Sequence, residues 1–223
     1  MFSQLAPRTA AVLAAALLLS PCSLAFDTPL SAEAIREAYF LGQRHDGSYP
    51  RLLEKYVKSL PPPETGPYIS SVSIRTPFIQ VVARSDAYIG NYSAQQAELD
   101  HRAQGKELVQ VFVDIELTES YGPLMPVSAS PHSSSAAALI PRSSDFWKDF
   151  QVRIYDGAEE ITTADSHGHA KYSCGRYGPC LLTGATLEFD FPASAFTSDS
   201  ATIDVMPPAG EPVSVDFDLS SLR

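Results

Sequence analysis

The sequence predicts a mainly β protein, and three observations support this fold class. Residues 107–117 alternate aliphatic with mostly polar side chains, which is the period of a strand that buries one face. Two short helical patterns precede the triplet Pro61-Pro62-Pro63. Further strand-like segments, separated by turn signals, lie at 68–75, 150–154, 160–164, 187–191, 201–206 and 213–219. Together these features predict an immunoglobulin-like β-sandwich with an N-terminal αα-hairpin and one or two further short helices.

The first 25 residues have the pattern of a secretory signal peptide. Arg8 precedes an apolar run from Ala10 to Leu19, and Ser23-Leu24-Ala25 has the small-x-small form of a signal-peptidase site. The run is shorter than the roughly 20 apolar residues that a membrane helix requires. We therefore expect cleavage after Ala25 and an exported protein, periplasmic or secreted, without a stable membrane span.

A lipoprotein attached through Cys22 is the alternative to a soluble exported form. Leu18-Leu19-Ser20-Pro21-Cys22 faintly resembles a bacterial lipobox. Pro21, however, stands where that motif has a small residue. We therefore expect a mature chain that begins at Phe26 and carries no lipid.

The charge of the chain narrows the classes of partner. The formal net charge is −10, and loss of Arg8 with the signal peptide would make it −11. Nucleic acids and anionic membranes require a basic surface. The composition therefore excludes both as main partners and leaves an unidentified protein or cell-envelope component.

Residues 26–63 are expected to form a helical segment packed on the main domain. Ser31 has the position of an N-cap, with Glu33 in the first turn of a helix that runs to about Leu41. Ser48 is the expected cap of a second helix, which would continue to Leu60 because apolar residues recur at helical spacing. The two helices would form the αα-hairpin.

Residues 64–223 are expected to form the β-sandwich domain. Residues 77–90 are compatible with helix, because Thr76-Pro77 is a typical helix start, and with strand, because the segment is rich in β-branched residues. A capping box at Ser93 predicts a helix to about Gln104. Residues 120–144 are rich in Ser, Pro and Ala and are expected to form a long loop.

The cysteines agree with export. After removal of Cys22, the chain keeps only Cys174 and Cys180, six positions apart across Gly and Pro residues. In an oxidising compartment this spacing predicts a local disulfide.

Asp165, His167 and His169 form a candidate metal site close to these cysteines. Histidines two residues apart in a strand point to the same side, so they could ligate one zinc ion with the carboxylate. The alternative is a Gly-containing surface loop, closed by the disulfide, with two solvated histidines.

No catalytic motif is found. The sequence has no Gly-x-Ser-x-Gly, no His-Glu-x-x-His and no phosphate-binding Gly-rich loop, and it predicts no cofactor. We therefore expect an exported non-catalytic binding or assembly module, not an enzyme. The alternative is a zinc-type metal-binding protein or enzyme centred on Asp165, His167 and His169.

Three stretches of the chain resemble uncharacterised exported bacterial proteins: residues 35–43, 92–99 and 215–222. The resemblance implies export, but it implies no activity, cofactor or site residue.

Overall fold

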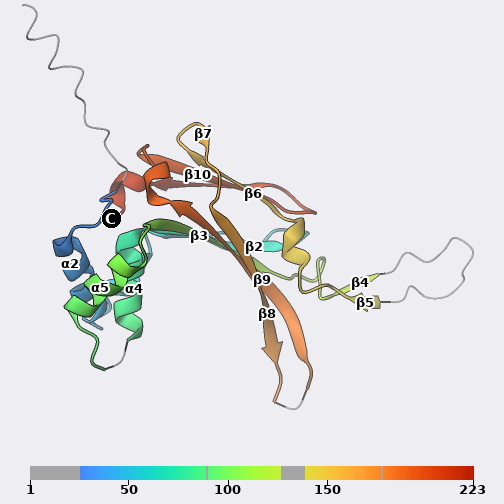
Figure 1. The fold of residues 1–223 in the computed structure, drawn as a ribbon. Helices are drawn as coiled ribbons and strands as arrows, with labels where there is room; N and C mark the ends of the chain where they lie inside the picture. Colours follow the sequence, from blue (N-terminus) through green and yellow to red (C-terminus); the bar gives the residue numbers. More distant parts are fainter. Residues whose placement is uncertain (1–25, 89, 127–138, 177) are drawn as a thin grey trace, which may run out of the picture.

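The computed structural model describes residues 26–88, 90–126, 139–176 and 178–223. The expected signal peptide, with Cys22, lies outside these residues, as does the middle of the loop at 120–144. Two antiparallel sheets lie face to face, with a cluster of helices at one end (Figure 1). The prediction of a mainly β protein is confirmed.

The larger sheet has five strands in the order β1-β2-β3-β9-β8. Their bounds are Val57–Ser59 for β1, Tyr68–Arg75 for β2, Leu108–Glu116 for β3, Cys180–Pro192 for β9 and Asp165–Cys174 for β8. The second sheet has the order β11-β10-β6-β7. Its strands are Val213–Asp218 for β11, Ser200–Met206 for β10, Gln151–Asp156 for β6 and Glu159–Glu160 for β7.

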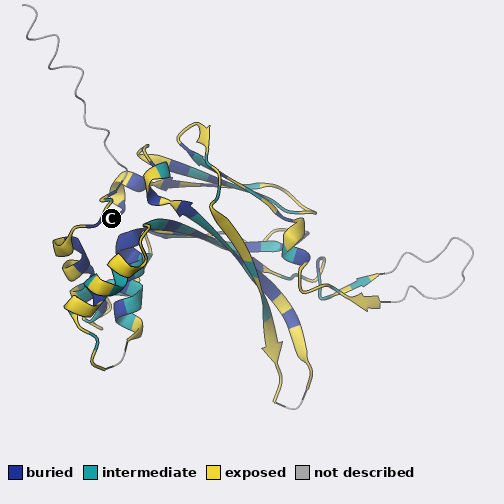
Figure 2. Cartoon of the chain, in the orientation of Figure 1, coloured by how far each residue is buried: buried dark blue, intermediate teal, exposed yellow. Residues whose placement is uncertain are grey.

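The core lies between the two sheets. On β3, Val109, Val111, Val113 and Ile115 are fully buried, and they alternate with residues on the outer face. This strand lies between β2 and β9, so its predicted central position and its register are confirmed. The inner faces of both sheets are buried, whereas the β8–β9 hairpin extends beyond the sandwich and is largely exposed (Figure 2).

The helices are α2 (Ala32–Gly42), α3 (Ser48–Leu53), α4 (Pro77–Ala87) and α5 (Ala94–Ala103). The choice between helix and strand at 77–90 is resolved as a helix for Pro77–Ala87, which Thr76 begins by accepting a hydrogen bond from the Ile79 amide. The predicted caps Ser31 and Ser93 are also confirmed. None of the helices in the described residues is long and apolar enough to cross a membrane.

The αα-hairpin prediction is wrong in its second half. Helix α3 ends at Leu53, and Val57–Ser59 form the edge strand β1 instead of a continued helix. The Tyr56 carbonyl accepts from the Ile74 amide, so pairing with β2 outweighs the helical spacing of the apolar residues. The N-cap of α3 is Gly47, not Ser48. Helix α2 packs on α4 and α5.

Residues 165–174 form a complete strand that pairs with β9 over its whole length. This is the strand that the candidate metal site assumed, and not the surface loop of the alternative. The long loop at 120–144 carries a short two-stranded ribbon, β4 (Leu124–Pro126) with β5 (Leu139–Pro141). Single-turn 3-10 helices lie at Phe146–Asp149 (η2), Ala193–Ala195 (η3) and Leu219–Ser221 (η4).

Candidate ligand-binding face

The outer face of the five-stranded sheet is polar. It follows from the register that alternate residues of four strands share this face. They form rows across β2, β3, β9 and β8: Arg75, Gln110, Asp190 and Asp165; Ser73, Phe112, Glu188 and His167; Ser71, Asp114, Thr186 and His169.

Asp114 is the centre of a hydrogen-bond network on this face. Its carboxylate accepts from Ser71 Oγ at 3.1 Å, from Thr186 Oγ1 at 2.7 Å and from Lys171 Nζ at 2.5 Å. Burial alone would raise the pKa of Asp114, but the hydrogen bonds from Lys171 and Thr186 outweigh it and lower the pKa. Asp114 is therefore an anion that joins β2, β3, β9 and β8.

A recess of about 920 Å³ lies where this face meets the helices. Its lining comes from the end of β2, one side of α4, the α5–β3 connection, and the helix-proximal ends of β3, β8 and β9. The charged and amide side chains that line it are Arg75, Gln80, Arg84, Gln104, Lys106, Gln110, Asp165 and Asp190.

One wall of the recess is basic and is held in place by neighbouring groups. The Arg75 guanidinium lies over the Phe112 ring, 4.3 Å from its centroid. When the Gln104 amide is assigned with its oxygen toward Arg84, the orientation that satisfies both groups, this oxygen accepts from both terminal nitrogens of Arg84. Among the described residues, no carboxylate oxygen lies within 4 Å of the charged nitrogens of Arg75, Arg84 or Lys106.

The opposite wall is acidic. Its carboxylates are Asp165 and Asp190. Gln110 Nε2 donates to Asp190 Oδ1 at 3.2 Å and, outside the lining, to Glu188 Oε1 at 2.8 Å. Asp165 lies opposite Asp190 in the register. The recess therefore offers fixed cations on one side and hydrogen-bond acceptors on the other.

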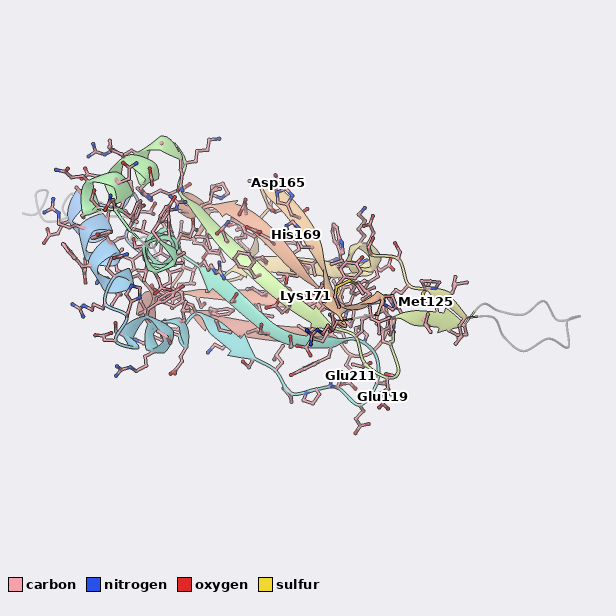
Figure 3. All side chains as sticks on the ribbon, turned by 90° about the horizontal axis from the view of Figure 1, so that it is seen from below. Glu119, Met125, Asp165, His169, Lys171 and Glu211 are labelled. Carbon is pink, nitrogen blue, oxygen red and sulfur yellow. A yellow bond between two sulfur atoms is a disulfide. The ribbon has the colours of Figure 1, made fainter. Side chains whose placement is uncertain are left out.

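The predicted metal residues lie on one edge strand, β8. Asp165 Oδ2 is 3.1 Å from His167 Nε2, and His169 lies two residues further along the same face. Figure 3 shows Asp165, His169 and Lys171 in line along β8. In the part of the chain that the structure describes, no three His, Cys, Asp or Glu side chains are arranged to hold a metal ion. The zinc site stays a prediction.

Cys174 and Cys180 form the predicted disulfide. They are the terminal pair of the β8–β9 ladder, so the bond closes the tip of the hairpin. The cysteines are therefore bonded to each other in this structure.

Replacing both cysteines with Ser should have a modest and local effect. The closed loop is short, so the chain-entropy estimate for the bond is about 2 kcal/mol, and the tip lies away from the core (Figure 1). We expect a lower melting temperature with an unchanged far-ultraviolet circular dichroism spectrum. Loss of the β signal in the double variant would show that the disulfide is needed for the fold itself.

The basic wall was not found from the sequence. Its residues come from three separate segments, and the negative net charge of the chain conceals a local cluster of cations. The one local signal is the sequence 102–106, which has two basic residues within a short acid-free stretch.

No protein-family model matches this chain, and neither does any curated protein.

Proposed function

We propose that this chain is an exported, non-catalytic binding module that holds the anionic group of a small ligand in the recess between α4 and the outer face of the five-stranded sheet. The observation that carries the proposal is the basic wall. Arg75, Arg84 and Lys106 lack a carboxylate partner among the described residues, in a chain whose net charge is −10. In such a protein, three cations beside one recess favour an anion as their partner.

The two arginines suit a carboxylate or a phosphate. A guanidinium can donate two parallel hydrogen bonds to either group. The Phe112 ring and the Gln104 amide hold Arg75 and Arg84 in position before binding, which reduces the entropy lost when the ligand is ordered. Lys106 adds a point charge.

The acidic wall indicates what the rest of the ligand carries. Carboxylates accept hydrogen bonds from hydroxyl groups. Asp165 and Asp190 are the carboxylates that line the recess, and Gln110 holds Asp190 in place for this role. A second fully anionic end would be repelled there. The ligand class we propose is therefore a polyhydroxylated small molecule with one carboxylate or phosphate, such as an acidic sugar.

Titration with galacturonate, compared with galactose, tests this proposal. The two sugars differ only at C6, where galacturonate has a carboxylate and galactose has a hydroxymethyl group. We therefore expect galacturonate to bind and galactose to bind only weakly. The double variant Arg84→Gln/Lys106→Gln should weaken galacturonate binding at least about tenfold, because a hydrogen bond to a charged group contributes roughly 1.5–3 kcal/mol. Isothermal titration calorimetry gives both affinities, and galactose 6-phosphate in place of galacturonate distinguishes phosphate from carboxylate.

The matched control is Arg36→Gln/Lys55→Gln, which makes the same change of charge at two exposed positions outside the recess. This control should bind as the unmodified protein does. An equal loss of galacturonate affinity in both double variants would show that net charge alone explains the effect. Equal binding of galactose and galacturonate, or no binding of any of the three probes, would contradict the proposal.

We also propose that the two sheets form an immunoglobulin-like sandwich. The strand order supports this. With β2, β3, β6, β8, β9, β10 and β11 taken as strands A to G, the sheets have the orders A-B-E-D and G-F-C. The additional edge strands are β1, which lies beside A, and β7, which lies beside C. Helices α4 and α5 would then be an insertion between strands A and B.

Export is part of the same proposal. The disulfide supports an oxidising compartment, and the N-terminal pattern supports a cleaved signal peptide. Zinc binding at Asp165, His167 and His169 is the second candidate function, and the 3.1 Å contact between Asp165 and His167 favours it.

A further inference from the structure

Strand β8 is an open edge of the five-stranded sheet. It is the last strand in the sheet order, and within the described residues the only strand that pairs with it is β9. The side chains of Asp165, His167 and Lys171 are 62%, 51% and 42% exposed. Such an edge presents a row of unpaired backbone groups that can pair with another strand.

The sequence of β8 is complementary to itself in one antiparallel register. If two copies pair with Gly168 opposite Gly168 of the partner subunit, Asp165 faces Lys171 of the partner subunit, and the reverse contact forms by symmetry. A register shifted by one residue pair in either direction removes this contact: it places Asp165 opposite His169 of the partner subunit or opposite Ser173 of the partner subunit. Opposite charges across a strand pair stabilise that pairing. Lys171 already donates to Asp114 in the single chain, and its ammonium group has further hydrogens for a second carboxylate.

The same register brings four histidines together. His167 faces His169 of the partner subunit, and His169 faces His167 of the partner subunit, all on the outer face of the combined sheet. Directly opposed residues have Cβ atoms about 4.5–5.5 Å apart, and imidazole nitrogens are ordinary zinc ligands in four-coordinate sites.

We propose that two copies of this chain pair along β8 and together bind one Zn²⁺ through His167 and His169 of each copy. A single chain supplies only two imidazoles, so the site is incomplete without the second copy. This explains why no metal-binding group is present within the described residues of one chain. The inference rests on the zinc binding proposed above as the second candidate function, with Asp165 orienting a ligand instead of binding the metal, and it does not rest on the ligand proposed for the recess.

Asp165 has a positioning role in this site. Its carboxylate contacts Nε2 of His167, which leaves Nδ1 of the same ring for the metal. Carboxylates commonly orient zinc-bound imidazoles in this way. On the inner side of β8, the Trp147 ring lies where a side chain at Gly168 would be, so the centre of the proposed pairing is packed against the rest of the protein.

Zinc-dependent dimerisation tests the inference. Strand pairing at one edge buries little apolar surface, so we expect the metal-free protein, purified without a histidine tag, to be a monomer. Addition of zinc should double the mass measured by light scattering after size exclusion, with one zinc per two chains by elemental analysis. His167→Gln/His169→Gln should abolish the doubling. Asp165→Lys should weaken zinc-dependent dimerisation at least tenfold, because the new positive charge would face Lys171 of the partner subunit and repel it.

His45→Gln is the control for the loss of an exposed histidine. His45 lies outside β8 and contacts Asp86. The His45→Gln variant should dimerise with zinc as the unmodified protein does. Zinc bound one to one by a monomer, no zinc bound at all, or dimerisation that persists in the His167→Gln/His169→Gln variant would each overturn the inference. Circular dichroism of every variant establishes that it is folded.

Discussion

Replacement of Val113 by Asp is expected to prevent folding. Val113 is fully buried in the middle of β3, where it lies between Val72 of β2 and Leu187 of β9. The substitution would bury a carboxylate without a partner, and the cost of several kcal/mol is comparable to the whole stability of a domain, about 5–15 kcal/mol. Soluble yield and far-ultraviolet circular dichroism of the variant measure this result.

Asp114→Val is the matched control on the opposite face of the same strand. It removes the acceptor of three hydrogen bonds, but its partners Ser71, Lys171 and Thr186 are only partly buried and can bond to water instead. We expect a soluble folded protein that is less stable by about 1–2 kcal/mol. Similar losses of soluble protein in the two variants would contradict the assignment of the inner and outer faces.

The fold was predictable where a segment carries its own periodic signal. Strand β3 alternates along its entire length, so its inner face could be read from residues 107–117. Ser31, Thr76 and Ser93 indicated where α2, α4 and α5 begin. A side-chain hydroxyl that accepts a hydrogen bond from an amide of the first turn depends only on the local sequence.

Strands that depend on a neighbour were not predictable in the same way. Strand β8 has few β-branched or aromatic residues and is a strand because β9 pairs with it along its length. Strand β1 lies in a segment whose apolar residues have helical spacing, and its pairing with β2 overrides that spacing. Tertiary pairing decided both cases.

The candidate site was predictable only in part. Asp165, His167 and His169 attracted notice because they are close in sequence. Arg75 and Lys106 were not recognised from the sequence, because two helices separate them in the chain and only the fold brings them to one recess. A short motif can be found without a structure, whereas a wall assembled from a strand end, a helix and a loop cannot.

Replacement of Gly184 by Ala is expected to be strongly destabilising. Gly184 pairs with Glu116 on one side and with Lys171 on the other, next to the irregularity between Lys171 and Tyr172. A Cβ at this position would lie 2.1 Å from the Ile115 carbonyl oxygen, a backbone atom of a buried strand. Because that oxygen cannot turn away as a side chain could, β3 and β9 would have to separate, at a cost of about 3 kcal/mol or more.

Gly178→Ala provides the matched control, because a Cβ at Gly178 would have no heavy atom within 4 Å. Thermal unfolding should therefore show a large decrease in melting temperature for Gly184→Ala and little change for Gly178→Ala. Gly184 also lies where the β8–β9 hairpin leaves the sandwich, since pairing between β3 and β9 ends there. A folded Gly184→Ala protein with unchanged stability would mean that β3 and β9 are less closely spaced at this point than the structure has them.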